Sequence, residues 1–324
     1  MRSLVLLIPV FGMSIATRAQ DSLKKTVPKI YPLVRNLSIQ KDYFGDSDYK
    51  LYSKDGDVQG EGRFSEQRLR ISAALPVYTK NRWSMTASLN YTRENFRYYT
   101  KSGEDLYRKS DFNSNNFDAL FSVGYRNFLF KKPVVYTATL IAGSRNFFDV
   151  KKLSGMVSAS LILKATPVTV STFGLLVNID QSSLFPFFPV FSYWHKFSGS
   201  AWEINTVVPQ KVIFRRPEVL HGWLSGGIEL GGNSFFTGST LSGQQGNYQW
   251  VANEMYSHVG YEYLFGKSVL LGVKGGFRNT ISNRLVKVNE RITNYESRTA
   301  VSSAFFNLNL GFILPGSKAA TRRR

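Results

Sequence analysis

A strict two-residue alternation of apolar and small polar side chains is the feature that most restricts how this chain folds. In segment 83–91, Trp83, Met85, Ala87, Leu89 and Tyr91 alternate with Ser84, Thr86, Ser88 and Asn90. Successive side chains of a β-strand point to opposite faces, so the segment predicts a strand with one apolar and one polar wall. The apolar wall is rich in aromatic residues and the polar wall in Ser, Thr and Asn. This favours a barrel with lipid outside and water inside.

The same alternation recurs along the chain and predicts a series of strands. They lie near residues 36–53, 66–78, 83–94, 115–126, 134–144, 155–164, 168–178, 187–197, 201–208, 211–215, 219–232, 252–264, 268–280 and 302–314. This series contains fourteen strands, and the weaker segments 36–53 and 201–215 leave twelve as the alternative.

The connections between these strands alternate in length. Short ones such as 79–82, 165–167 and 265–267 are interleaved with long ones such as 54–65, 95–114, 233–251 and 281–301. Bacterial outer-membrane barrels have short periplasmic turns and longer external loops. The sequence therefore predicts an all-β protein, a transmembrane antiparallel β-barrel of about 12–14 strands with its long loops outside the cell.

The N-terminus has the pattern of a secretory signal peptide over residues 1–19. A positive Arg2 precedes an apolar run from Leu4 to Ile15, and small residues stand at Thr17 and Ala19. The apolar run is too short to cross a hydrocarbon layer of about 30 Å, which argues against a membrane anchor. We then expect a periplasmic lead at 20–35, one barrel at 36–314 and a basic tail at 315–324.

Composition narrows the possible partners. The 324 residues contain no Cys, which excludes disulfides and thiolate metal sites. The formal net charge of +19 comes from Lys and Arg spread over connections and tails, such as Lys131 and Lys132. Nucleic-acid binding needs a basic stripe on a soluble domain, so we do not expect it. The pattern indicates contact with outer-membrane lipid and lipopolysaccharide phosphates, and no motif predicts a protein partner.

The polar wall of the predicted strands carries charges of both signs. The candidate lumen-lining residues are Arg68, Arg70, Asp118, Arg126, Glu203, Glu229, Glu254, His258, Glu262, Lys274 and Arg278. An unpaired charge facing lipid would cost about 2–4 kcal/mol at the membrane midplane, which supports placing these side chains inside. They suit either a hydrated pore or a lumen closed by ion pairs.

No arrangement of residues predicts catalysis. Glu254, His258 and Glu262 share one strand face, but neighbours in this set are about 13–14 Å apart at the rise of a strand. A metal site or an acid–base pair would need groups from adjacent strands. Ser257 and His258 point to opposite faces, so they cannot form a nucleophile–base pair.

Candidates to complete such a site are Glu229, Lys274 and Arg278. His195 and His221 are the other two histidines of the chain. The chain lacks a phosphate-binding loop, a dinucleotide fingerprint and the zinc-protease motif. We therefore predict no catalytic residue, no metal site and no cofactor.

Two stretches resemble a family of Gram-negative outer-membrane β-barrels of unknown function. They are Phe187–Trp194, with the sequence FFPVFSYW, and Trp202–Pro209, with the sequence WEINTVVP, followed by the aromatic Phe214. The resemblance implies a barrel in the bacterial outer membrane and no assigned activity. Many such barrels end at an aromatic residue read by the barrel-insertion machinery, a role that Phe312 would take here.

These observations predict a non-enzymatic, porin-like barrel. It would be a passive channel or transporter for small solutes, or a structural surface protein. One alternative is a lipid- or lipopolysaccharide-modifying hydrolase, and another is the barrel component of a secretion or surface-assembly complex.

Overall fold

The computed structural model describes residues 35–102, 106–146, 149–183, 186–239 and 245–313, which form strands and the turns between them. The predicted signal peptide at 1–19, all but the last residue of the lead at 20–35 and the tail at 315–324 lie outside the described residues. Within the described ranges, no helix is long and apolar enough to cross a membrane.

Fifteen strand segments are present in the described residues. Their bounds are β1 Leu37–Ser53, β2 Val58–Lys80, β3 Trp83–Ser102, β4 Leu106–Leu129, β5 Lys132–Ser144, β6 Val150–Ala165, β7 Thr169–Ile179, β8 Phe187–Lys196, β9 Glu203–Val208, β10 Lys211–Val219, β11 Gly222–Ser239, β12 Gln245–Phe265, β13 Val269–Lys287, β14 Tyr295–Ala300 and β15 Ser302–Phe312. Both β14 and β15 pair with β13 and with β1, so they are one strand interrupted at Val301. The barrel therefore has fourteen strands.

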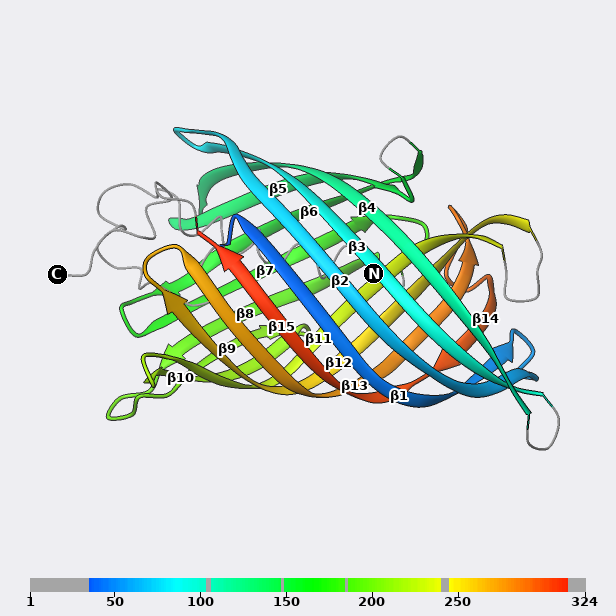
Figure 1. Ribbon diagram of the computed structural model, residues 1–324. Helices are drawn as coiled ribbons and strands as arrows, with labels where there is room; N and C mark the ends of the chain where they lie inside the picture. Colours follow the sequence, from blue (N-terminus) through cyan, green and yellow to red (C-terminus); the bar gives the residue numbers. More distant parts are fainter. Residues whose placement is uncertain (1–34, 103–105, 147–148, 184–185, 240–244, 314–324) are drawn as a thin grey trace.

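The sheet closes on itself through the pairing of its first strand with its last (Figure 1). Each strand pairs antiparallel with its neighbour in sequence, and Leu37 of β1 lies opposite Phe312 of β15. Closure leaves no sheet edge in the membrane, where unpaired backbone groups are costly. Short turns lie at the same end as these termini, such as Phe130–Lys131, where both residues have positive φ, as a tight two-residue hairpin requires. The predicted all-β antiparallel barrel is confirmed.

The outer face of the barrel is apolar. Leu89, Phe121, Phe173 and Phe277 each expose between 44% and 66% of their surface there. Aromatic pairs line this band, with Trp83 and Tyr125 ring centroids 4.6 Å apart. Such a band needs lipid around it, and the barrel is an outer-membrane barrel.

The wall of the barrel is uneven in height. Strands β1–β4 and β11–β13 have 17 to 24 residues, whereas β7–β10 have 6 to 11. Segments 54–65, 95–114, 233–251 and 281–301, which we predicted as long loops, are largely strand, so those predicted boundaries are wrong. Segment 95–114 interleaves aromatic and charged residues, whereas segment 233–251 is rich in Ser, Gly and Gln and contains no charge. We interpreted both patterns as solvated loops.

The tall strands continue past the turns of the short ones at one end of the molecule (Figure 1). Beyond Phe117, β4 has no partner in β5, and beyond Leu230 β11 has no partner in β10. The two free edges belong to β4 and β11, which lie on opposite sides of the fourteen-strand barrel. Even so, Cα atoms of β4 and β11 approach within 8 Å of each other. We call the resulting eight-strand extension the turret. It comprises residues 47–66, 94–116, 231–254 and 281–301, as far as they are described.

Candidate functional site: the closed lumen

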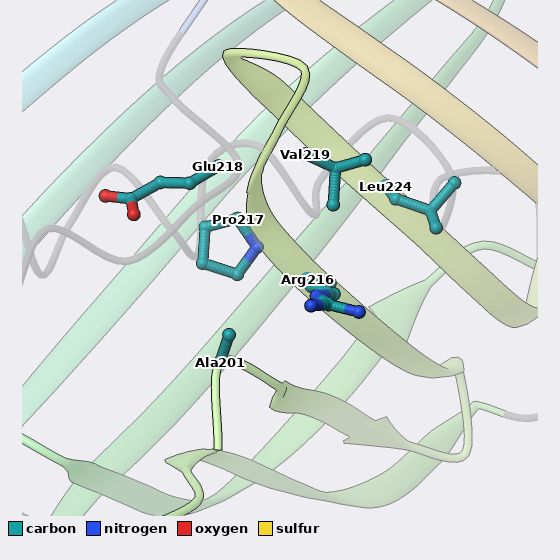
Figure 2. Close-up of a pocket in the computed structure, with 6 residues that line it drawn as sticks. All are labelled: Ala201, Arg216, Pro217, Glu218, Val219 and Leu224. Carbon is teal, nitrogen blue, oxygen red and sulfur yellow. The ribbon is translucent and has the colours of Figure 1, made fainter. Parts of the chain in front are cut away.

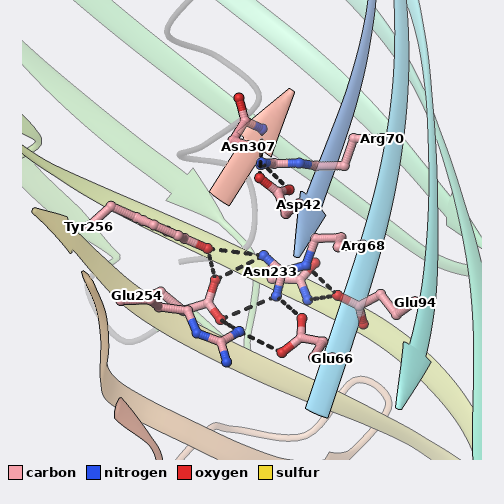
Figure 3. Close-up of polar contacts among 10 residues, drawn as sticks. Asp42, Glu66, Arg68, Arg70, Glu94, Asn233, Glu254, Tyr256 and Asn307 are labelled. Carbon is pink, nitrogen blue, oxygen red and sulfur yellow. Dashed lines mark hydrogen bonds and ion pairs between the residues drawn. The ribbon is translucent and has the colours of Figure 1, made fainter. Parts of the chain in front are cut away.

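Five charged side chains meet inside the barrel at the base of the turret (Figure 3). Arg68 from β2 contacts three carboxylates: Glu66 at 2.7 Å, Glu94 at 2.7 Å and Glu254 at 3.0 Å. Arg278 from β13 contacts Glu254 at 3.2 Å and also Glu66. All five are at most 4% exposed, and we call them the floor network.

The floor network connects strands that are not neighbours in the sheet. Arg68 and Glu254 come from β2 and β12, four positions apart around the barrel. Asn233 of β11 donates a hydrogen bond to Glu94 of β3, six positions away. The guanidinium carbon of Arg278 lies 3.7 Å from the centroid of the Phe44 ring, so this cation also stacks on an aromatic face. These contacts cross the lumen and close it at this level.

Above the floor network, the turret holds a packed apolar core. Its buried members, drawn from β1, β2, β3, β11, β12 and β13 and from Val301, are Leu51, Phe64, Phe96, Phe235, Tyr248, Trp250, Leu285 and Val301. The rings of Phe96 and Phe235 lie 5.4 Å apart, and Phe112 of β4 lies 5.9 Å from Phe235. An eight-strand barrel is about wide enough for side chains to fill, which is how this core seals the turret.

A second apolar cluster lines the inner face of the shorter wall. Leu120, Ile141, Met156 and Leu176 are buried together, from β4, β5, β6 and β7. Phe188 and Val190 of β8 pack against them. We did not predict this cluster, because we expected a polar inner wall throughout the barrel. The cluster could have been recognised from Leu120 and Ile141, two apolar residues on the inner wall that lie opposite each other on adjacent strands.

Below the floor network, toward the short turns, the inner charges are more accessible. Lys274 lies 3.3 Å from Glu229, and His258 lies 3.6 Å from the same carboxylate. The side chains of Lys274 and Glu229 are 27% and 36% exposed. We call this region the lower lumen. Water reaches the Lys274 and Glu229 side chains.

Other predicted residues lie in separate pairs around the lower lumen. Arg70 contacts Asp42 at 2.7 Å, and Asp42 also accepts a hydrogen bond from Asn307 at 2.7 Å. Glu203 contacts Arg215 at 3.1 Å. Glu262 pairs with Arg35, which lies just before β1, and burial lowers the pKa of Arg35 to about 10.

The last two predicted residues, Asp118 and Arg126, both lie on β4. Asp118 accepts a hydrogen bond from Asn116 at 2.9 Å, and Arg126 lies near the short-turn end of β4. The structure does not bring Glu254, His258 and Glu262 together. Their ionic partners include, respectively, Arg68, Glu229 and Arg35. Among the described residues, no group of three or more His, Asp or Glu side chains could hold a metal ion.

Two further places could suggest chemistry. The Thr169 hydroxyl lies 2.8 Å from Nδ1 of His195, beside the stacked ring of Tyr193. A shallow pocket at the short-turn end is lined by Ala201, Arg216, Pro217, Glu218, Val219 and Leu224 (Figure 2). In that view Arg216 and Glu218 point away from each other, so the pocket has no convergent polar groups.

Comparisons with known proteins found structural likeness only. No protein-family model and no curated protein sequence matches the chain. An outer-membrane channel from Pseudomonas putida F1 has 10% identity and a TM-score of 0.34, over 87% of this chain and 97% of its own. The Escherichia coli outer membrane phospholipase A has 8% identity and a TM-score of 0.30, over 97% and 99%. A TodX mutant monoaromatic hydrocarbon channel has 10% identity and a TM-score of 0.29, over 91% and 95%.

Proposed function

We propose that this outer-membrane barrel is a non-enzymatic surface protein whose own side chains close its lumen. Its role would be structural: to hold a rigid eight-strand turret above the membrane. The observation that supports this is the contact between the free edges of β4 and β11, with a packed core between them, as shown by the 5.9 Å approach of Phe112 and Phe235. A solute moving along the barrel axis would meet this core and the floor network.

Electrical recording in planar bilayers tests the proposal. Full-length protein, shown to be folded by its altered migration on unheated gels, should give no stepwise currents. A Phe96→Ala, Phe235→Ala double variant removes two rings from the seal and should give flickering currents. The control is Phe121→Ala, which removes a ring from the lipid-facing side and should stay silent. Steady steps from the unmodified protein would overturn a structural role.

A gated passage is the second candidate, and the lower lumen favours it. Lys274 and Glu229 are partly accessible to water directly beneath a closed floor. In this case the closed lumen is a resting state, and a ligand or a voltage would open it. Currents that appear in the unmodified protein only above a threshold voltage would favour this candidate over a structural role.

The enzyme alternative depends on the Thr169–His195 pair. A hydroxyl nucleophile needs a base, and the base needs a third group to orient it. In the described part of the chain, His195 has ring contacts and this hydroxyl, and no carboxylate bonds to it. We therefore propose that folded protein does not hydrolyse phospholipid or lipopolysaccharide. Turnover that His195→Ala abolishes would reverse this conclusion.

A further inference from the structure

The short-turn end of the barrel carries a ring of exposed positive charge. The β2–β3 and β4–β5 turns present Lys80, Arg82, Lys131 and Lys132. The ends of β6, β8 and β10 present Lys164, Lys196 and Arg216, and the β12–β13 turn presents Lys267. All eight are exposed, and in the described turns and adjoining strand ends here the one exposed acid is Glu218, near the end of β10. We call these eight cations the basic rim.

The opposite end of the molecule has a different charge pattern. Its exposed cations are interspersed with acids, and some of them form ion pairs, as in Arg63–Asp48 at 3.0 Å and Arg97–Asp111 at 3.5 Å. Among the described residues, none of the eight cations of the basic rim forms an ion pair with a carboxylate. Glu218 points away from its neighbour Arg216 (Figure 2). Charge of one sign held in a ring would repel itself unless an anionic surface surrounds it.

Apolar side chains stand among these cations. Phe130 is 84% exposed, Leu220 is 79% exposed and Phe265 is 66% exposed, all at or next to the turns. Exposed apolar tips beside long cationic side chains suit the boundary between acyl chains and headgroups, where apolar stems and tips lie in the membrane and charges reach the phosphates.

We propose that the basic rim binds anionic phospholipid headgroups of the inner leaflet and so selects acidic lipids around the periplasmic end of the barrel. The inner-leaflet assignment depends on the short turns facing the periplasm, as they do in bacterial barrels. The proposal is independent of whether the lumen conducts. The ligand would be a lipid with a phosphodiester headgroup of net negative charge attached to acyl chains.

Spin-labelled lipids at the protein boundary test this directly. Folded full-length protein in phosphatidylcholine vesicles should prefer spin-labelled phosphatidylglycerol over phosphatidylcholine by about twofold or more at low salt. The preference should fall toward unity in 1 M salt, where the Debye length is about 3 Å. Equal association of the two lipids at low salt would overturn the proposal.

Matched variants locate the effect. A rim variant, Lys80→Gln, Arg82→Gln, Lys131→Gln and Lys132→Gln, should lose at least half of the preference. A control with the same residue types changed at the external end, Lys50→Gln, Lys54→Gln, Lys287→Gln and Arg291→Gln, should keep it. A preference lost only in the control would assign anionic-lipid binding to the external end and refute the basic rim. The basic rim would also be refuted if lipid A displaced spin-labelled phosphatidylglycerol from the protein and this displacement required the external cations.

Discussion

Replacing Arg68 with Met should destabilise the barrel more than any single change on its surface. Arg68 is 2% exposed and neutralises carboxylates from β2, β3 and β12 at 2.7–3.0 Å. The floor network has two cations for three carboxylates, and the variant leaves Arg278 alone against all three. Breaking one buried pair costs about 3–5 kcal/mol, because a desolvated charge stays uncompensated. We expect a loss of about 4 kcal/mol or more in the free energy of unfolding.

The measurement is denaturant unfolding of the protein in lipid vesicles, followed by tryptophan fluorescence. The control is Arg63→Met on the same strand, where the ion pair with Asp48 is exposed and the expected cost is under about 1 kcal/mol. Adding Glu94→Gln to Arg68→Met should recover part of the loss, because Arg68 is the cation that contacts Glu94 in the floor network, whereas Glu66 and Glu254 keep their contacts with Arg278. A cost below about 1 kcal/mol for Arg68→Met would show that the floor network does not hold the turret base together.

Three further results are expected. Phe235→Ala should lower the free energy of unfolding by about 3–5 kcal/mol, as the loss of a buried aromatic ring does, measured in the same titration. Gly276→Ala should prevent normal assembly, because a Cβ there would lie 2.0 Å from the backbone oxygen of Ser257, and the folded fraction on unheated gels reports it. Cysteine at Thr293 should react with a membrane-impermeant thiol reagent on whole cells, whereas cysteine at Lys80 should react only after lysis; the reverse pattern would invert the orientation.

The alternation of apolar and polar residues predicted most of the fold, because each membrane strand has lipid on one side. Every predicted strand is present, and Arg68, Glu254 and Arg278 were predicted on the inner wall. Two members of the floor network, Glu66 and Glu94, were not selected. They stand at the ends of the predicted segments 66–78 and 83–94, where the strand was expected to become a loop. The spacing of Glu66 and Arg68, two residues apart on one face, was the signal available.

Cross-barrel contacts could not be predicted in the same way. Alternation places a side chain on a face, but it does not show which strand lies opposite. The hydrogen bond from Asn233 to Glu94 depends on the curvature that brings β11 against β4. Only the tall strands extend far enough to make this approach, and the predicted loops concealed the difference in length between tall and short strands.

The start of the turret can be recognised in the sequence. Within one uninterrupted strand, the apolar residues change from odd to even positions. In β3 the outward apolar residues stand at odd positions up to Tyr91, whereas the inward apolar residues beyond it, Phe96 and Tyr98, stand at even positions. The pairing of β3 with β4 continues across this change without a bulge, so no residue has switched faces. What changes is the solvent: lipid outside gives way to water outside, and the apolar wall moves to the interior. In β4 the same change occurs between Phe117 and Phe112. A strand that inverts its apolar phase without a bulge therefore indicates where a membrane barrel ends and a water-exposed one with its own packed core begins.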